Sequence, residues 1–427
     1  MSRITCSREV KSPLSGINVI ELGQFIAAPY CAQLLGDAGA DVLKIEPLNG
    51  DESRRGGVRL SSTEATQFLN KNRNKRSMAC DLRNPDVRQI VADLLARADV
   101  VITNLRPGKA KELGIDFESV TKVNPRIIYA ENTGFGPQGP LAGLPGMDVA
   151  LQGYTGLAQF SDDGIAPIRE PVVDYTAAML MAWGVSTALY SREKTGQGQR
   201  LEVSLLQAAL VLQNNEIHHV DEVDEWRDDY VAFLKESFSN GASWQDVLAY
   251  RDSLVPKPLT GAYYGFFEGS DGVLCLAGGG SAIQKKIAKF LGVSDPLLET
   301  GTLPTEDRTG YVAQQRQLVA SRLKEDTVAS WIERFKAVGI PVSRVQLKDE
   351  LLNDEQVWAN DYLTRIDHPE HGKLSVVSPP VKFSGTPLTV RRPPPGLSEG
   401  AEELLAELGI SDEKVQELLA SGVVRSG

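Results

Sequence analysis

The sequence has few of the residues that build metal centres and disulfide scaffolds. Among 427 residues there are 4 cysteines and 4 histidines, and no two cysteines are spaced as CxxC. This argues against a disulfide scaffold or a cysteine-based zinc site and favours a reducing compartment. His368 and His371 stand close together in DHPEHG, but the sequence shows no further ligands beside them, so no metal site is predicted.

Basic residues and long apolar segments are also scarce. The chain has 45 basic and 56 acidic residues, a formal net charge of −11. A general nucleic-acid binder needs a basic footprint, so that class is disfavoured, while a local basic pocket for a small anion remains allowed. The N-terminal stretch MSRITCSREVKSPLSG has no apolar signal region, and we find no run long enough to span a bilayer. We therefore expect a cytoplasmic protein with no membrane partner.

The first half of the chain alternates strand and helix patterns. Short β-branched runs predict strands at 16–24, 40–47, 98–104, 125–134 and 200–206. Longer periodic segments predict helices at 29–40, 84–98 and 175–191. This order predicts an α/β fold with a parallel sheet and helices on its faces.

The length of the chain exceeds the usual size of one compact core, so two domains are expected. Residues 1–215 form the first part of a large domain, and residues 216–335 form a small domain with its linkers. Residues 336–427 return to complete the large domain.

The first strand and helix invite comparison with dinucleotide-binding folds. Glu46 stands where a ribose-binding acid would be expected. After the strand, however, the chain reads GQFIAAP and lacks the GxGxxG glycines that let a pyrophosphate approach the backbone. No nicotinamide or flavin cofactor is therefore predicted; Gly23 then marks a tight turn, and Glu46 is the polar end of a strand.

Three basic segments stand out against the acidic background. The segment KNRNKRS, residues 71–77, is either a solvated face, the usual role of a charge run, or an anion site, because Lys, Arg and Asn suit phosphate oxygens. TNLRPGKAK, residues 103–111, begins where a predicted strand ends, at the edge where parallel sheets bind ligands. Arg54 and Arg55 follow the second strand. The three together favour an anion site.

A resemblance to a known family is carried by most of the chain and is densest in its first half. The matching stretches are GINVIELGQFIAAPYCAQLLGDAGADVLKIEPLNGDESRR, NKRSMACDL, ADVVITNLRPGKAKELGID, NPRIIYAENTGFGPQGPLAGLPGMDVALQGYTGL, DYTAAMLMAWGVSTALYSREKTGQGQRLEVSL and GISDEKVQELLASGVV. With these stretches the sequence resembles the family III CoA-transferases, the group of the formyl-CoA and carnitine CoA-transferases. The match is weakest at about 215–260.

The resemblance implies a fold and a set of substrates. The fold is a large domain with a Rossmann-like parallel sheet, a smaller α+β domain and a chain that returns to the large domain, in an interlocked homodimer. The substrates are an acyl-CoA and a carboxylic acid, with no tightly bound cofactor.

It also implies site residues. Asp174, in REPVVDYTAAMLMAWG, matches the catalytic aspartate of the family. Lys109 or Lys111 would replace a basic residue common in the family where this chain has Glu112. The CoA-binding set, drawn from the segment after the first strand and from the basic segments, is Gln24, Phe25, Ile26, Arg54, Lys75, Arg76, Asn104, Leu105, Arg106, Lys109 and Lys111.

The chemistry that the resemblance implies is covalent. Asp174 attacks an acyl-CoA to form a mixed anhydride and CoA thiolate, the thiolate forms an aspartyl-CoA thioester, and an acceptor acid then takes the CoA. Asp174 precedes a helix-like run, so the positive end of the helix would favour its ionised form, and the apolar neighbours would exclude water. From the residues alone, an ordinary Asp N-cap is the alternative.

Two other functions are weighed against CoA transfer. The 2-methylacyl-CoA racemases of the same fold have a histidine where GMDVALQG here has Met147, and a methionine cannot carry a proton. A non-enzymatic CoA-ester binding protein would have no use for Asp174. Arg169 would pair with a second carboxylate and so favours a dicarboxylate such as succinate, unless it is an ordinary surface residue.

Overall fold

The computed structural model describes residues 12–161, 164–222, 224–255 and 259–427. Its contacts divide the chain into two units, one formed by residues 1–219 with 359–427 and the other by residues 220–358. Each unit has a hydrophobic core of its own.

The first unit is built on a six-stranded sheet in the order β3-β2-β1-β4-β5-β8. Every pair of neighbouring strands in it is parallel. The strands are β1 (Asn18–Leu22), β2 (Asp41–Glu46), β3 (Lys75–Ala79), β4 (Val100–Thr103), β5 (Ile128–Thr133) and β8 (Gln199–Ser204). The strands predicted from the sequence correspond to five of these, and the parallel α/β architecture is confirmed.

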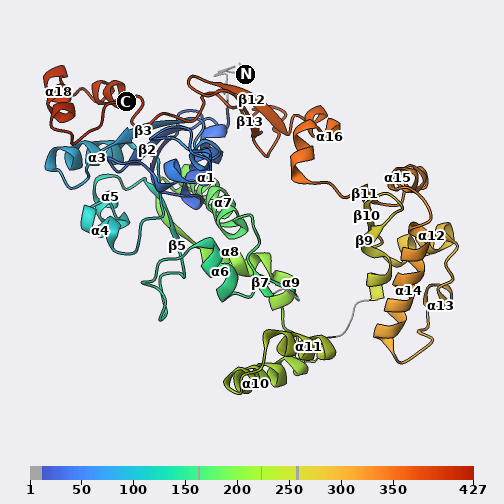
Figure 1. Ribbon diagram of the computed structural model, residues 1–427. Helices are drawn as coiled ribbons and strands as arrows, with labels where there is room; N and C mark the ends of the chain where they lie inside the picture. Colours follow the sequence, from blue (N-terminus) through green and yellow to red (C-terminus); the bar gives the residue numbers. More distant parts are fainter. Residues whose placement is uncertain (1–11, 162–163, 223, 256–258) are drawn as a thin grey trace, which may run out of the picture. The chain divides into compact units, whose positions relative to one another are not determined.

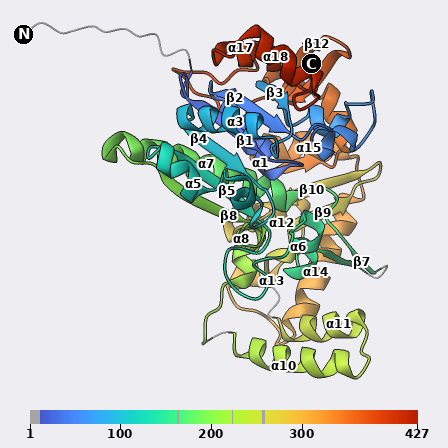
Figure 2. The same cartoon turned by 90° about the vertical axis from the view of Figure 1, so that its left-hand side faces the viewer.

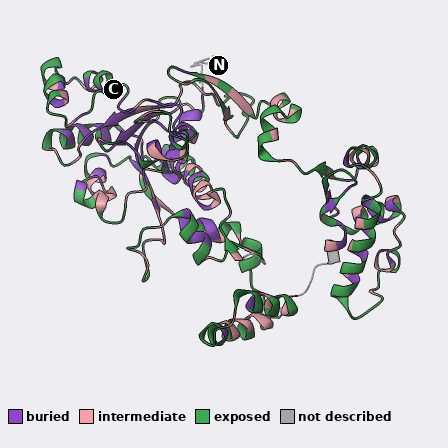
Figure 3. Cartoon of the chain, in the orientation of Figure 1, coloured by how far each residue is buried: buried purple, intermediate pink, exposed green. Residues whose placement is uncertain are grey.

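Helices cover both faces of this sheet (Figure 1). One face packs against α1 and α7 and the other against α3, α5 and the C-terminal helices α17 and α18. The helices of this unit are α1 (Ala27–Asp37), α2 (Thr66–Leu69), α3 (Pro85–Arg97), α4 (Lys109–Leu113), α5 (Phe117–Val123), α6 (Asp148–Tyr154), α7 (Val172–Thr195), α8 (Leu205–Leu212), α9 (Asn214–Ile217), α17 (Ala401–Glu407) and α18 (Asp412–Ala420). Figure 3 shows the central part of the sheet as a largely buried layer between them, whereas the edge strand β8 is exposed or half-buried along its length.

Local chemistry explains where several of these helices begin and end. Asn84 caps α3 by accepting the amides of Asp86 and Val87, and Pro85 occupies the first helical position. Helix α7 ends at Gly196, whose φ of 74° is the left-handed conformation that glycine adopts without strain.

The C-terminal segment returns to the far edge of the sheet. Helix α17 contacts β3, and Cys80 pairs with Val424 in an isolated bridge. Figure 2 shows α17 and α18 beside β3 from a second direction. Two hairpins complete the unit: β6 (Gln159–Ser161) with β7 (Gly164–Ala166), and β12 (Leu363–His368) with β13 (Gly372–Val377).

The second unit contains an antiparallel sheet in the order β11-β10-β9. Its elements are α10 (Glu225–Ser239), α11 (Trp244–Leu254), β9 (Tyr264–Glu268), β10 (Val273–Ala277), α12 (Ser281–Leu291), α13 (Pro296–Thr300), α14 (Arg308–Leu323), α15 (Val328–Ala337), β11 (Val342–Arg344) and α16 (Glu355–Ala359). Strand β11 pairs with β10 in this unit, beyond the boundary at residue 335 that the sequence suggested.

Helix α7 corrects one expectation from the sequence. With 24 residues it is, by length and composition alone, long and apolar enough to cross a membrane, although no such run was expected. Its buried residues Met181 and Val185 pack in the core that α7 shares with α1 and the sheet. This packing accounts for the apolar character of that side of the helix, which we therefore regard as a core helix.

Candidate active site

A cavity of about 910 Å³ lies in the first unit, at the carboxyl edge of its parallel sheet. Its walls include the chain that follows β1, β2, β3, β4 and β5. The strand order reverses between β1 and β4, and open α/β sheets bind ligands at such a switch point. The volume falls in the range typical of small-molecule sites.

Asp174 lines this cavity from the first turn of α7. The residue before the helix is Pro171, so Asp174 lies inside the helix and is not its N-cap. Asp148 accepts the free amides instead: the backbone N–H groups of Val173 and Asp174 donate to its Oδ2, at 2.8 and 3.0 Å. The interpretation of Asp174 as an ordinary N-cap is therefore wrong.

Burial, rather than the helix terminus, dominates the ionisation of Asp174. Loss of water around the carboxyl raises its pKa from 3.8 to about 7; the negative charge of Asp148 also raises it, and Lys71 lowers it. The expected preference of the helix N-terminus for the ionised form is thus outweighed. The carboxylate that accepts the free amides at the positive N-terminal end of α7 is Asp148, not Asp174.

Asp148 is itself held in place by hydrogen bonds. The side-chain amide of Gln152, one turn further along α6, donates to Oδ1 of Asp148 and to the carbonyl of Ile168. The backbone N–H of Ile168 donates back to Gln152 Oε1 at 2.7 Å. These contacts tie the start of α6 to the segment that leads into α7, and so they set the position of Asp174.

Another part of the cavity wall is formed by the turn after β1. Asn104 clamps this turn: its Oδ1 accepts the amide of Gln24 at 2.9 Å, and its Nδ2 donates to the Gln24 carbonyl at 2.8 Å. Phe25 follows with a φ of 65°, uncommon for a residue other than glycine, and its amide donates to Asp51 at 3.1 Å. A backbone conformation of this kind persists only where neighbouring contacts fix it, and here the hydrogen bonds with Asn104 and Asp51 do so.

A buried ionic network contacts this turn. Lys44 pairs with Glu21 at 2.6 Å and with Asp51 at 2.9 Å, and it donates to the carbonyl of Gly23 at 2.8 Å. All three charged side chains are fully buried. Removing one member would leave an uncompensated buried charge, so the network gives the turn a defined position.

The structure brings together six of the CoA-binding residues predicted from the sequence. Together with Asp174, the residues on the cavity wall are Gln24, Phe25, Asn104, Leu105, Arg106 and Lys109. Arg106 is exposed, and Lys109 also pairs with Glu112 at 2.6 Å. Ile26 and Lys111 do not line the cavity.

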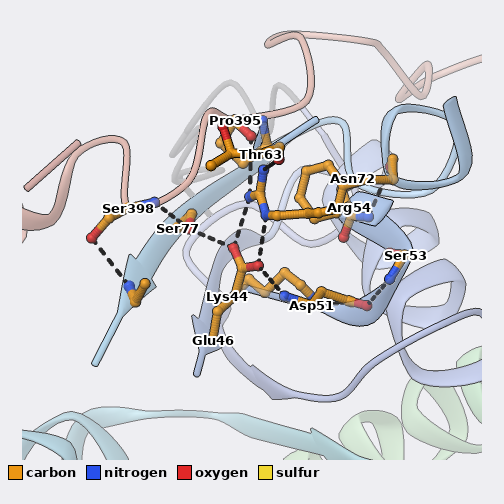
Figure 4. Close-up of polar contacts among 12 residues, drawn as sticks. Lys44, Glu46, Asp51, Ser53, Arg54, Thr63, Asn72, Ser77, Pro395 and Ser398 are labelled. Atoms are coloured by element: carbon orange, nitrogen blue, oxygen red, sulfur yellow. Dashed lines mark hydrogen bonds and ion pairs between the residues drawn. The ribbon is translucent and has the colours of Figure 1, made fainter. Parts of the chain in front are cut away.

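Arg54 lies off the cavity and is almost fully buried. Its guanidinium forms two hydrogen bonds of 2.8 Å with the carboxylate of Glu46 and lies over the ring of Phe68 (Figure 4). Because these N–H groups of Arg54 already form a bidentate pair with Glu46, they are not available to bind a phosphate. Glu46, at the end of β2, is therefore the partner of a buried arginine.

The basic segment 71–77 is internal, contrary to the solvated-face interpretation. Residues 71–75 are buried, and strand β3 begins at Lys75. Lys75 pairs with Glu21 at 2.7 Å, and Arg73 binds both carboxylate oxygens of Asp37. Arg76 bridges to Asp41 and to Glu407 on α17, each at 2.8 Å. Arg73 and Lys75 neutralise buried carboxylates, Arg76 pairs with two exposed ones, and none of the three lines the cavity.

Three further residues belong to the site: Arg83 and Asp148 were not singled out from the sequence, and Lys71 was named only as part of the basic segment 71–77. Arg83, after β3, is a basic residue on the cavity wall. Asp148 orders the start of α7, and Lys71 acts electrostatically on Asp174. Arg83 follows β3, a strand that the sequence did not predict, and Asp148 becomes recognisable only once α6 and α7 are placed together.

Two residues weighed from the sequence have clear positions. Met147 is the N-cap of α6 and lines the cavity with Asp174, so a thioether stands where racemases have a proton carrier. Arg169 is exposed and does not line the cavity within this unit.

The fold and cavity define an α/β protein with a ligand site at the switch point of its sheet and a carboxylate of raised pKa on the wall. Residues 14–401 match the CoA-transferase family III profile. Succinyl-CoA:glutarate CoA-transferase of Mus musculus is 30% identical over 96% of this chain and 90% of its own length. The succinyl-CoA–L-malate CoA-transferase beta subunit of Chloroflexus aurantiacus is 29% identical over 96% and 98%.

Solved structures agree with this fold. A CaiB/BaiF family protein from Brucella suis matches with a TM-score of 0.72 and 27% identity, covering 93% of this chain and 100% of its own. A Mycobacterium tuberculosis protein shares the fold at a TM-score of 0.74 and 23% identity, covering 92% and 99%. The chain belongs to CoA-transferase family III and is a CoA-transferase.

Proposed function

We propose that this enzyme moves CoA from an acyl-CoA to a carboxylic acid through covalent intermediates on Asp174. The observation that carries the proposal is the position of Asp174, which stands on the wall of the cavity with its pKa raised to about 7. At neutral pH a large share of such carboxyls is ionised and nucleophilic. Burial strips water from the carboxylate, which protects an activated intermediate from hydrolysis.

The reaction proceeds in balanced steps. A carboxylate oxygen of Asp174 attacks the thioester carbonyl, the C–S bond breaks, and CoA leaves as a thiolate from a mixed anhydride. The thiolate attacks the Asp174 carbonyl and releases the donor acid, which leaves an aspartyl-CoA thioester. The acceptor carboxylate displaces the thiolate in the same manner, and the thiolate then takes the acceptor acyl group and restores the Asp174 carboxylate.

Basic side chains at the cavity provide for the phosphates of CoA. Arg106, Lys109 and Arg83 all line the cavity. Their donors suit phosphate oxygens, and a basic rim attracts an anionic substrate even though the whole protein is acidic. Arg54 and Lys75 pair with buried carboxylates and Arg76 with two surface carboxylates, so we assign all three to the scaffold of the unit.

A dicarboxylate is the substrate class that we propose for the acid. The relatives described above are named for succinyl-CoA with glutarate and with L-malate as partners. Arg169 remains a candidate for the second carboxylate, although it lies outside the cavity of this unit.

The test is a panel of acyl-CoA donors, with succinyl-CoA included, against mono- and dicarboxylate acceptors. CoA transfer should occur with the wild type and disappear in Asp174→Ala and Asp174→Asn. Hydroxylamine added with the donor should convert Asp174 to a hydroxamate, visible as a mass shift of its peptide. A folded Asp174→Ala protein with near-wild-type turnover would contradict the mechanism.

Racemisation and simple binding are distinguished by the same preparation. In heavy water the enzyme should incorporate no deuterium at the α-carbon, because Met147 removes the expected second proton carrier. Rapid α-deuteration without CoA exchange would establish an isomerase. Tight binding of a CoA ester with neither reaction would indicate a binding protein.

We further propose that the enzyme works in the cytoplasm as an interlocked homodimer. Met179, Trp183 and Tyr190 on α7 are exposed by half or more of their surface and lie on one side of the helix. A second chain covering this apolar stripe would remove it from water. Light scattering should give twice the mass of the chain; a monomer at micromolar concentration would contradict the dimer.

A further inference from the structure

Two histidines and a glutamate converge at a point that does not line the active-site cavity. His368 ends β12 and His371 lies in the turn that joins β12 to β13. Glu64 comes from a loop some three hundred positions earlier in the chain and within the same unit. The ligand atoms of the three side chains all lie within 4.8 Å of one another.

The three side chains are shielded from water. Glu64 is 3% exposed and His368 is 6% exposed, and His371 is partly buried. His371 Nε2 lies 2.6 Å from one oxygen of Glu64, and His368 Nε2 lies 3.9 Å from the other. Among the described residues, these two histidines are the ion-pair partners recorded for the buried Glu64 carboxylate. A buried carboxylate is stable only when it is paired or coordinates a metal.

The orientation of His368 adds a second observation. Its ring is stacked on that of His371 at 4.7 Å between centroids, and its Nε2 has no hydrogen-bond partner within the described residues. A buried nitrogen without a partner, directed toward a carboxylate that is too distant for a hydrogen bond, is unusual in a packed protein. A cation between the two groups would satisfy both.

We propose that Glu64, His368 and His371 form a site for a divalent transition metal, with Zn²⁺ as the best fit. Two imidazole nitrogens and one carboxylate oxygen form a ligand set that zinc accepts, with water as the fourth ligand. The amide of Glu370 donates to Nδ1 of His368 at 3.2 Å, so binding through Nε2 requires this hydrogen bond to be given up and the ring proton to move to Nδ1. A lone neutral hydrogen bond is weak beside a metal–imidazole bond.

The site would serve as a clip. It joins the loop around Glu64 to the hairpin of β12 and β13, with which the chain re-enters the first unit after the second. Arg73 makes another connection there, donating to the carbonyl of Val377 at 2.6 Å. None of the three ligands lines the cavity, so the metal would act on the stability of the hairpin and take no part in CoA transfer.

The experiment uses the full chain, treated with a chelator and then titrated with Zn²⁺ by calorimetry. One Zn²⁺ per chain should bind and raise the thermal unfolding midpoint. Loss of an outer-shell partner already weakens metal sites by about 10–100-fold, so Glu64→Gln or His371→Asn, which removes a ligand, should weaken binding by more than about a hundredfold. His218→Asn is the matched control, since His218 is exposed and lies in another part of the unit; it should bind as the wild type does.

X-ray absorption of the zinc-loaded wild type keeps the test decisive if a ligand variant fails to fold, because it reports two imidazoles and oxygen directly. The proposal is overturned if the wild type takes up no stoichiometric Zn²⁺, if the spectrum shows fewer than two imidazoles, or if folded ligand variants bind as the His218→Asn control does. The cluster would then be a hydrogen-bonded histidine–glutamate pair.

Discussion

Replacing Asp174 should make the protein more stable at high pH. The Asp174 carboxyl has its pKa raised from 3.8 to about 7, chiefly by burial. Ionising it therefore costs free energy in the folded state that it does not cost in the unfolded chain. A difference of about 3 in pKa at about 1.36 kcal/mol each corresponds to about 4 kcal/mol, an upper bound because water in the cavity solvates part of the charge.

The sign and the pH window follow from proton uptake. Between about pH 4 and pH 7 the folded protein holds a proton on Asp174 that the unfolded chain has lost, so this group lowers stability as the pH rises and has its full effect above pH 7. Asp174→Asn lacks the titration and keeps the shape. Its advantage over the wild type in free energy of unfolding should be small near pH 4, grow with pH and level off above pH 7.

Urea denaturation of both proteins from pH 4 to pH 9, at one protein concentration, measures this advantage. Asp93→Asn is the control, because Asp93 is exposed on α3 and hydrogen-bonds only to Gln89 among the interactions recorded for it. Its difference from the wild type should not follow the same curve. A difference for Asp174→Asn that is independent of pH, or that has the opposite sign at pH 8, would refute the argument that burial controls this carboxyl.

Three other variants address the site. Asp148→Asn removes a charge that raises the pKa of Asp174, so the acidic limb of the kcat/KM profile should move to lower pH; a profile that stays in place would show that Asp148 acts only as a helix cap. Arg106→Ala should weaken CoA-ester binding about ten- to a hundredfold, the value of a charge-assisted contact, whereas Lys111→Ala, off the cavity wall, should not; equal effects would contradict the geometry. Lys75→Ala should cost about 3–5 kcal/mol in urea denaturation, because it breaks a buried ion pair with Glu21; unchanged stability with weakened CoA binding would return Lys75 to the ligand site.

Most of the sheet and its flanking helices could be predicted from the sequence. The strands β1, β2, β4, β5 and β8 are short apolar runs between turn residues, and α3 carries both its cap, Asn84, and a proline at its first position. Local signals of this kind survive in the fold because they agree with the tertiary packing. Strand β3 was missed because its sequence, KRSMA, begins with two cations. Only the acidic partners Glu21, Asp41 and Glu407, all distant in the sequence, make these cations compatible with the sheet.

The difference between local signals and partners distant in the sequence also explains which parts of the site were predicted. Position after a strand end is a local property, and it indicated the segment with Asn104 and Arg106; the family resemblance added Gln24, and all three share one cavity. The role of a cation depends on its partner, which is not local. Lys75 and Arg106 are both cations within basic segments of the sequence. Lys75 neutralises a buried carboxylate, whereas Arg106 lines the cavity. The sequence shows where the basic side chains are. Whether such a side chain is available to a ligand depends on whether the fold buries it against a carboxylate.

Two opposing effects act on the pKa of Asp174: the positive end of the helix lowers it, and burial raises it. Their relative magnitudes decide the result. A helix terminus stabilises a nearby anion by about 0.3–1 kcal/mol, up to about 2 kcal/mol when partly buried. Desolvation shifts carboxyls by several pKa units, which is several kcal/mol, and a second carboxylate adds to that shift. Because Asp148 already accepts the amides of the first turn, Asp174 gains little from the helix and bears the cost of burial. That arrangement leaves the carboxylate poorly solvated and therefore reactive, which is the property that an attack on a thioester requires.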